Sequence, residues 1–221
     1  MIYTLIFDGN TEKRDCRDMR QPPVLLSPEL MDYISSAKNE NHRAERLYAY
    51  SMLTLGLDRF FGVKDFKIVR SKDGKPSLVL PDQDKSIYIS LSHSDGVAIA
   101  VLSDEGDIGA DIQSKIDPAT EERLSKRFFS DTEITPARLE VRYFLVNESL
   151  DIKEITLKDV DWKLSFTDRW TACESIIKCD GRGFEIASSL PCLIENYLTE
   201  IKLFPIVKTE YSIAISKKKP L

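Results

Sequence analysis

Three predicted strands follow one another with only short turns between them, and this succession constrains the fold more than any other feature of the chain. Segments 86–92, 96–102 and 107–112 are rich in β-forming residues, and the run SDEGD turns the chain into the third of them. Further strands are predicted over 1–7, 63–69, 197–204 and 211–215. Much of the chain is therefore expected to lie in sheets.

Helices are predicted between these strands. Ser27 and Pro28 are typical of a helix start, as N-cap and first helical residue, and apolar residues recur at helical spacing across 39–61. Other helical segments are predicted over 118–129, 135–146 and 166–179. The last is expected to be capped by Thr167 or Asp168 and to end at the run DGRG. Residues 149–164 are predicted to be loop or short strands.

The length of 221 residues suits one large domain or two of about 100 residues each. Strand, helices and strands are followed by more helices and strands, which predicts an α+β protein. We expect two similar-sized halves, 1–104 and 105–221, although no repeat in the sequence is strong enough to relate them.

Composition excludes several classes of protein. The net charge of −5 gives no overall attraction to nucleic acid, and no run reaches the ~20 apolar residues of a membrane helix. The first residues, MIYTLIFDGN, do not resemble a signal peptide, so we expect a cytoplasmic protein. The four cysteines form no C-x-x-C pair and the chain has two histidines, which favours reduced, packed thiols over a zinc site or disulfides.

The run GDIGADIQ places a carboxylate inside an apolar strand. Asp111 and Gln113 are two apart, so both side chains lie on one face, while Ile108, Ala110 and Ile112 lie on the opposite, buried face. A lone strand acid is often a plain surface residue. The alternative is that the face of Asp111 looks toward a ligand.

A second candidate group lies in the run WTACESIIK. Glu174 and Lys178 are four apart on a predicted helix and share one face, where they could form an ordinary ion pair worth ~0.3–0.5 kcal/mol. The run GRG follows, where the backbone can turn sharply or approach a ligand closely.

Four further residues are candidate donors to an anion. Lys75 lies in the turn DGKP, Ser92 and His93 lie at a strand end in SLSHSDG, and Arg46 lies on the long predicted helix. Each has an ordinary alternative: a surface lysine, a structural histidine, or an arginine that covers its own helix.

Together these residues fit one chemistry. Asp111, Glu174 and the neutral oxygen of Gln113 are hard ligands of the kind that Mg²⁺ takes, and the donors could hold a polyphosphate. A phosphate-bearing substrate on a carboxylate-bound metal is typical of phosphoryl-type transfer. The sequence contains neither G-x-x-x-x-G-K-[ST] nor G-x-G-x-x-G.

The ordered motifs GKP, LSHS, GADIQ, RFFS…E and WTACESIIKCDGRG resemble those of the Sfp-type 4′-phosphopantetheinyl transferases, over about half of the chain. The resemblance implies a pseudo-dimer of two α/β halves with the active site in the cleft between them. It also implies an activity: the phosphopantetheine arm of coenzyme A passes to a serine of an apo acyl or peptidyl carrier protein, and adenosine 3′,5′-bisphosphate leaves.

By this resemblance Asp111 and Glu174 would bind Mg²⁺, and Gln113 stands where many members have another acidic ligand. Lys178 would contact the phosphates and assist the leaving oxygen. Glu174, or a water bound to the metal, would take the proton of the carrier serine. The resemblance assigns the coenzyme A phosphate contacts to Lys75, Ser92 and His93, and more loosely to Arg46.

Two departures from the family pattern leave an alternative open. Gln113 is neutral, and Cys173 stands where relatives often have a lysine. A relative that binds coenzyme A or a carrier protein without turnover therefore remains the second hypothesis, and an unrelated metal-dependent phosphotransfer or hydrolysis enzyme the third. We expect a monomer without nucleic-acid or membrane partners, which would serve fatty acid, polyketide or nonribosomal peptide synthesis.

Overall fold

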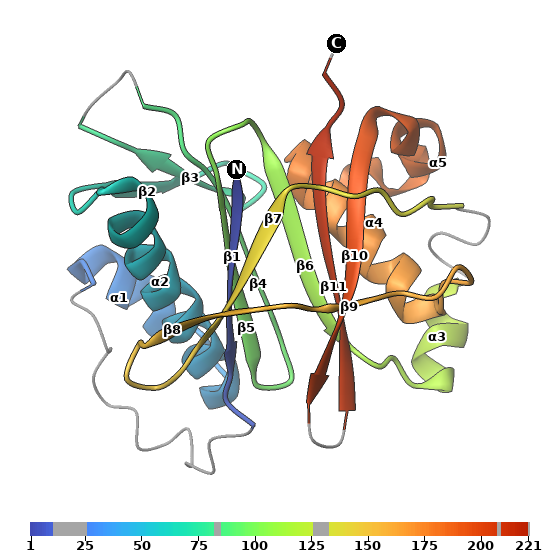
Figure 1. Ribbon diagram of the computed structural model, residues 1–221, viewed down its shortest axis with the longest axis horizontal. Coiled ribbons are helices and arrows are strands. Elements are labelled where there is room, and N and C mark those ends of the chain that lie inside the picture. Colours follow the sequence, from blue (N-terminus) through green and yellow to red (C-terminus); the bar gives the residue numbers. More distant parts are fainter. Residues whose placement is uncertain (11–25, 82–84, 126–132, 207–208, 221) are drawn as a thin grey trace.

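The computed structural model describes residues 1–10, 26–81, 85–125, 133–206 and 209–220. Two larger sheets lie face to face, each covered on its outer side by a long helix (Figure 1). The first sheet has the order β4-β5-β1-β7-β8, and the second has the order β6-β11-β10-β9. The strand bounds are β1 Ile2–Asp8, β4 Tyr88–Ser94, β5 Val97–Ser103, β6 Ile108–Ser114, β7 Val141–Val146, β8 Ile152–Ile155, β9 Lys158–Asp159, β10 Tyr197–Ile206 and β11 Thr209–Lys218.

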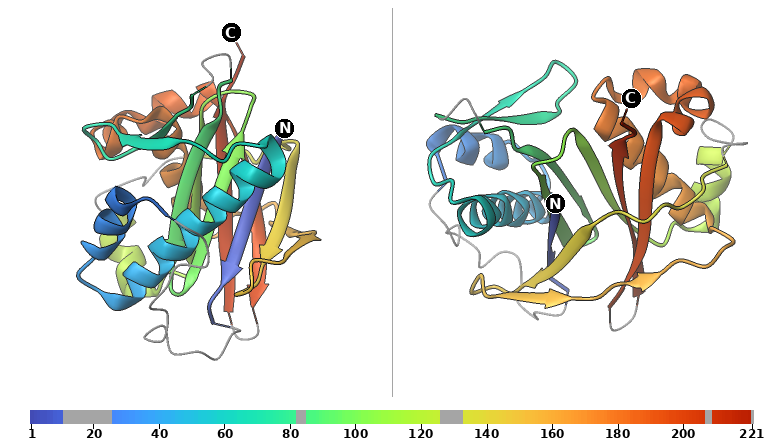
Figure 2. Two further views of the ribbon diagram at one scale, coloured as in Figure 1. Left: turned by 90° about the vertical axis from the view of Figure 1, so that its left-hand side faces the viewer. Right: turned by 45° about the horizontal axis from the view of Figure 1, so that its top comes forward.

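Helices form the outer layers. Helices α1 and α2 cover the first sheet, and α4 covers the second, so that the layers run helix, sheet, sheet, helix (Figure 2). A short hairpin of β2 and β3 adjoins the first sheet. The remaining bounds are α1 Pro28–Ser35, α2 Glu40–Phe61, β2 Lys67–Arg70, β3 Pro76–Val79, α3 Pro118–Ser125, α4 Phe166–Asp180, η2 Gly183–Ser189, α5 Leu190–Leu193 and η3 Ile194–Asn196.

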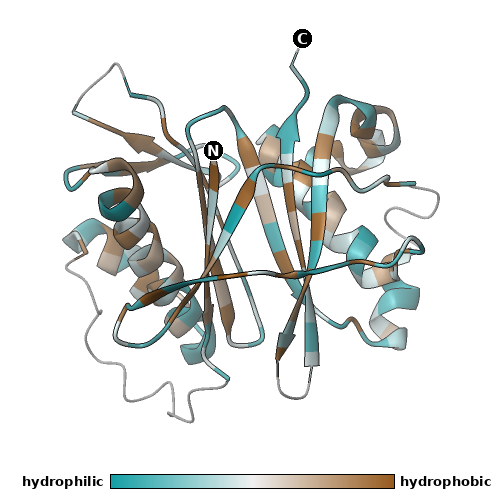
Figure 3. Cartoon of the chain, in the orientation of Figure 1, coloured by the Kyte–Doolittle hydropathy of each residue, from teal (hydrophilic) through white to brown (hydrophobic). Residues whose placement is uncertain are grey.

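Three apolar clusters separate these layers, and the strand alternation explains them. Along β6, Ile108, Ala110 and Ile112 pack into the core between the two sheets, against residues of β1, β5 and β11. Figure 3 shows the corresponding alternation of apolar and hydrophilic positions along β6. The opposite face of the first sheet packs on α2, and that of the second sheet packs on α4.

Local sequence signals explain where the long helices begin and end. Ser27 caps α1 with Pro28 in its first turn, and Asn39 caps α2. Helix α4 begins at Phe166, as predicted, but the predicted cap at Thr167 or Asp168 is wrong: Ser165 is the N-cap, in a capping box where the side chains of Ser165 and Asp168 each accept the other's backbone N–H. Gly181, at φ 86°, ends α4 in the left-handed conformation that glycine favours.

A row of serine side chains joins the two sheets where their edge strands β4 and β6 meet. The Oγ atoms of Ser90, Ser92 and Ser94 accept hydrogen bonds from every second backbone N–H group of β6, at residues 110, 112 and 114 respectively. An unpaired strand edge needs such partners when it is buried. The serine row therefore fixes β6 against β4 without a backbone ladder.

The structure differs from the sequence predictions in three segments. The helix expected over 135–146 is wrong: residues 141–146 form β7, which pairs in parallel with β1. The strand expected over 63–69 is shorter and later, and β3 was not predicted. The predicted helix over 118–129 is described only to Ser125, where α3 ends; residues 126–132 lie outside the described part of the chain.

Mixed α and β architecture is as predicted, and the division into halves 1–104 and 105–221 stays a prediction. Strands β7 and β8, from the second of these segments, complete the first sheet, and the chain then crosses through β9 to the second sheet (Figure 1). Within the described residues no helix has the length and apolar character needed to cross a membrane.

Candidate active site

Asp111 is buried at 4% exposure on the face of β6 that looks toward α4. Two residues earlier on the same face, Gly109 lies directly under the helix: a Cβ there would fall 2.0 Å from the backbone oxygen of Ser175 and 2.2 Å from the backbone nitrogen of Cys179. Glycine therefore permits a close approach of strand and helix. That approach brings the side chains of α4 over Asp111.

Lys178 of α4 makes the contact. Its Nζ lies 2.6 Å from Asp111 Oδ1 and donates to Ser92 Oγ at 2.9 Å. Ser92 Oγ in turn donates to Asp111 Oδ1 at 2.7 Å. Residues from β4, β6 and α4 thus meet in one buried polar group.

Glu174, one turn before Lys178 on α4, belongs to the same group. Burial and then the negative charge of Asp111 raise its pKa to about 7, against the opposing effects of Lys178 and of a hydrogen bond with Trp170. The two carboxylates are therefore close enough to repel each other. A cation bound between them would relieve that repulsion.

The chemistry of this donor set fits a magnesium ion. Mg²⁺ is usually held by one or two carboxylates together with substrate phosphates and water. Asp111 and Glu174 would supply the carboxylates and leave the other positions to phosphate and water. In the described part of the chain, no cluster of three or more His, Cys, Asp or Glu side chains is placed to hold a metal. Gln113, on the Asp111 face, donates from Nε2 to Ser94 Oγ at 3.4 Å.

His93 and Ser92 point to opposite faces of β4, as neighbours on a strand must. His93 faces α2, where its Nδ1 lies 2.7 Å from Glu45 Oε2 and its ring centroid lies 5.6 Å from that of His42. The structure therefore joins Ser92, but not His93, directly to Asp111. The Ser92 hydroxyl already contacts Asp111, Lys178 and the backbone N–H of Ile112. The sequence predicts a phosphate contact for Ser92 and none of these three.

Lys75, in the turn between β2 and β3, packs its side chain against the C-terminal end of α4. Its Nζ donates to the backbone oxygen of Cys179 at 2.8 Å and to Asp107 Oδ1 at 3.2 Å. It thereby ties the β2–β3 turn to the residue that follows Lys178. Its place beside the site agrees with the expected neighbourhood, while its role toward a phosphate stays a prediction.

Arg46 lies elsewhere. Its guanidinium lies over the ring of Tyr33 on α1, 5.0 Å from the centroid, next to Arg70, which lies over the same ring at 3.5 Å. The contacts of Arg46 thus include α1 rather than the group around Asp111. The alternative that Arg46 covers its own helix is therefore not what this contact shows, and its role toward a phosphate stays a prediction.

Cysteines fill apolar space around the site. Burial raises the pKa values of Cys173 and Cys179 to about 12, which keeps both thiols protonated and unreactive at neutral pH. Cys173, Cys179 and Cys192 are all free. Cys16 and the motif RFFS, at positions 127–130, lie outside the described residues.

Sequence reasoning missed Glu45 and the serine row. Glu45 is buried on α2, and the only signal for it was an acid at an otherwise apolar helical position. Ser90, Ser92 and Ser94 alternate in the run SLSHS, and this period of two could have indicated a polar strand face.

Half of the chain is similar in sequence to a protein named as a transferase. No family model matches the chain. Over 110 residues the chain is 33% identical to a protein of Synechocystis sp. that is provisionally named a 4′-phosphopantetheinyl transferase. The match covers 50% of this chain and 37% of the relative, so the chain spans little more than a third of the length of that protein.

Proposed function

We propose that this protein is a 4′-phosphopantetheinyl transferase, which moves the phosphopantetheine arm of coenzyme A to a serine of an apo acyl or peptidyl carrier protein. The observation that carries the proposal is the meeting of Asp111 with Lys178 and Glu174 between β6 and α4. The similarity to the Synechocystis protein supports the same class of enzyme.

Asp111 and Glu174 would hold Mg²⁺, with Gln113 as a neutral third ligand or as a contact through water. When bound, the ion supplies charge compensation for the diphosphate of coenzyme A as the bond to the leaving group breaks. The repulsion between the two carboxylates supports this assignment. Both are shielded from solvent, so a bound cation would stabilise their ionised forms.

The chain's own groups would move the proton and the charge. The serine oxygen of the carrier attacks the phosphorus that bears the pantetheine arm, and the bond from that phosphorus to adenosine 3′,5′-bisphosphate breaks. Glu174, whose pKa of about 7 lies near neutral pH, is suited to accept the serine proton at its carboxylate. Lys178 is placed to compensate the charge that grows on the leaving oxygen.

The fold offers a frame for this chemistry. The two sheets, each covered by a long helix, resemble the two similar halves of the proposed family, with the Asp111 group at their junction. A single chain would then supply the whole site, as a monomer of the cytoplasm with coenzyme A and a carrier protein as its partners. Lys75, Ser92 and His93 would contact the phosphates of coenzyme A.

A binding protein without turnover is the second candidate, and Gln113 is the observation that favours it, because the neutral amide removes one anionic ligand from the site. Both candidates are tested by mixing the protein with coenzyme A, Mg²⁺ and an apo carrier protein and measuring the mass of the carrier. Transfer predicts a gain in mass on one serine. Tight binding of coenzyme A without a mass gain would support the second candidate instead.

A further inference from the structure

We propose that Glu45 is a positioning residue for coenzyme A binding, which acts by fixing the orientation of the His93 imidazole so that its Nε2 atom faces a phosphate group. This inference rests on the proposed function, since it deepens the assignment of His93 as a phosphate contact. Nothing in the family resemblance pointed to Glu45.

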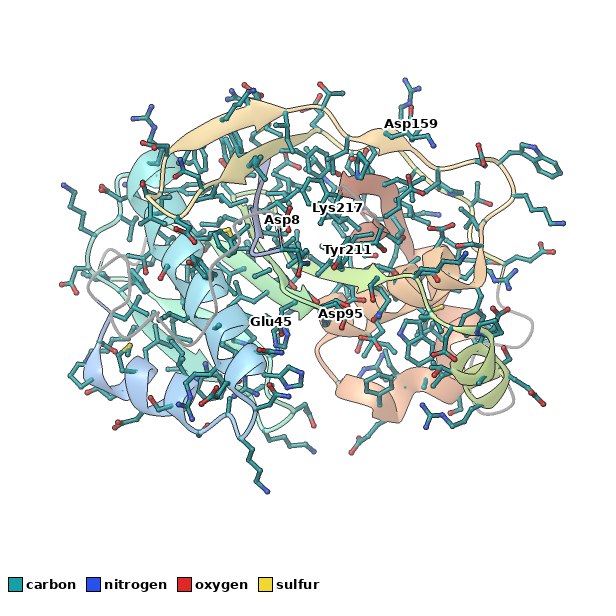
Figure 4. The ribbon with its side chains drawn as sticks, turned by 90° about the horizontal axis from the view of Figure 1, so that it is seen from below. Asp8, Glu45, Asp95, Asp159, Tyr211 and Lys217 are labelled. Atoms are coloured by element: carbon teal, nitrogen blue, oxygen red, sulfur yellow. The ribbon has the colours of Figure 1, made fainter. Side chains whose placement is uncertain are left out.

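The two carboxylate oxygens of Glu45 both face the β4–β5 hairpin. Oε2 lies 2.7 Å from His93 Nδ1, and Oε1 accepts the N–H of Gly96 at 2.6 Å. Figure 4 shows Glu45 on α2 beside the turn that carries Asp95. With 5% of its side chain exposed, Glu45 is held at two points and cannot turn without losing one of them.

This arrangement decides which atom of His93 is available. Nδ1 is occupied by the carboxylate, so Nε2 is the ring nitrogen left for a ligand, and 29% of the side chain is exposed. An imidazolium held between Glu45 and a phosphate oxygen donates one N–H to each of two anions. Such charge-assisted hydrogen bonds are stronger than neutral ones.

The charge of Glu45 is compatible with this role. Burial raises its pKa, but the contacts with His93 and with the Gly96 N–H outweigh burial and leave the pKa below its ordinary value. Glu45 is therefore ionised at neutral pH. His42, the other histidine of the chain, also faces this carboxylate from the preceding turn of α2 and contributes in the same direction.

The alternative is a purely structural Glu45 that only fastens the hairpin through Gly96. The two roles differ in what a Glu45→Gln variant does to His93. Because the Gly96 N–H needs an acceptor, the amide oxygen of glutamine is expected to face Gly96, which leaves the amide NH2 facing His93. That group donates to Nδ1 and so moves the proton of a neutral imidazole to Nε2.

The first test is ¹⁵N NMR of the histidine rings in the full chain, at about pH 8.5, two units above the ordinary histidine pKa. The two histidines are assigned with His42→Gln and His93→Gln variants. The inference predicts the Nδ1–H form of His93 in the wild type and the Nε2–H form in Glu45→Gln. A wild-type His93 in the Nε2–H form would overturn it. Glu40→Gln, the same change at an exposed site of α2, is the control and should leave the His93 signals unmoved.

The second test is a double-mutant cycle on the dissociation constant of coenzyme A, measured by calorimetry with Mg²⁺ present. His93→Gln is chosen because its amide can still donate to the buried Glu45. We expect His93→Gln to weaken binding about tenfold and Glu45→Gln about threefold to tenfold, since each removes a charge-assisted bond. In the His93→Gln background, Glu45→Gln should have no further effect. Effects that multiply would show that Glu45 acts independently of His93 and would overturn the inference.

Failure of the inference and failure of the proposed function give different results. A wild-type protein that binds coenzyme A with a non-additive cycle but modifies no carrier would overturn the transfer activity and leave the role of Glu45 intact. A protein that labels the carrier and shows an additive cycle would support the transfer activity and overturn the role of Glu45. A protein that does not bind coenzyme A would overturn both.

Discussion

Lys178 Nζ lies 2.6 Å from Asp111 Oδ1, and this contact joins the helix that covers the second sheet to the edge strand of that sheet. The pair is 67 residues apart in the sequence and meets because Gly109 lets α4 lie directly on β6. Asp111 is buried and Lys178 is partly exposed, and such an ion pair adds little net stability because desolvation of the carboxylate offsets much of the attraction. The position of the Asp111–Lys178 pair beside Glu174 fits the proposed metal and phosphate site better than a purely stabilising role.

Replacing Lys178 with methionine should remove the charge while keeping most of the side-chain volume. If Lys178 compensates the leaving oxygen as proposed, the rate of carrier labelling should fall about 100-fold or more, because a preorganised cation is lost. The melting temperature should also fall, because the buried Asp111 carboxylate loses its charge partner; a far-UV circular dichroism spectrum like that of the wild type would show that the variant is folded at the assay temperature. Labelling at the wild-type rate would show that Lys178 does not act on the reaction.

Gly109→Ala should separate α4 from β6. The new Cβ would lie 2.0 Å from a backbone oxygen of the helix, so helix or strand must shift, at a cost of about 3 kcal/mol or more in the free energy of unfolding. Urea unfolding measures this loss. Gly62→Ala is the comparison, because its site is open and costs only the strain of φ 66°, about 1 kcal/mol. Equal losses in the two variants would contradict the close approach.

Gln113→Glu should strengthen Mg²⁺ binding. A carboxylate would replace a neutral amide on the face of Asp111, and we expect affinity to rise about tenfold, which corresponds to about 1.4 kcal/mol. Calorimetric titration with Mg²⁺ in the presence of coenzyme A measures the change. An affinity equal to or below that of the wild type would exclude Gln113 from the metal site.

Asp180→Asn should destabilise the protein in a pH-dependent way. A hydrogen bond from Arg182 lowers the pKa of Asp180 from 3.8 to about 2, against burial, and Tyr197 assists. The folded state therefore favours the ionised form, so the stabilisation is present above pH 3.8 and is lost as the pH falls toward 2. Because solvent screens the exposed Arg182, we expect a loss of about 1 kcal/mol at pH 7.

Unfolding curves of Asp180→Asn and the wild type should approach each other as the pH falls through about 2 and should converge below it, where Asp180 is protonated in both states. Asp161→Asn, at an exposed site just before α4, is the control and should match the wild type at every pH. A difference between Asp180→Asn and the wild type that is independent of pH would show that the carboxylate charge is not the cause.

Sequence reasoning could identify the residues that converge because their local patterns are strong. Alternation placed Asp111 opposite the apolar face of β6, and helical spacing placed Glu174 beside Lys178; both features are present in the structure. The partners of side chains at the end of a strand are harder to predict from the sequence. Ser92 and His93 are neighbours on β4 and point to opposite faces, so Ser92 contacts Asp111 and His93 contacts Glu45.

Tertiary contacts explain the segments that sequence reasoning missed. Residues 141–146 have no Gly or Pro and fit a helix locally, but pairing with β1 fixes them as a strand. Glu45 was hidden because an acid on an apolar helix face is usually a surface residue. Its partners, His93 and Gly96, lie about 50 residues away and are brought to it only by the fold.

The central claim, that Asp111 and Glu174 hold one divalent ion together, is tested most directly by calorimetric titration of Mg²⁺ in the presence of coenzyme A. The wild type should bind the ion, and Asp111→Asn and Glu174→Gln should each lose that binding while keeping the wild-type circular dichroism spectrum. Glu195→Gln, a matched change at an exposed site, should bind as the wild type does. Undiminished binding in either site variant would contradict the account.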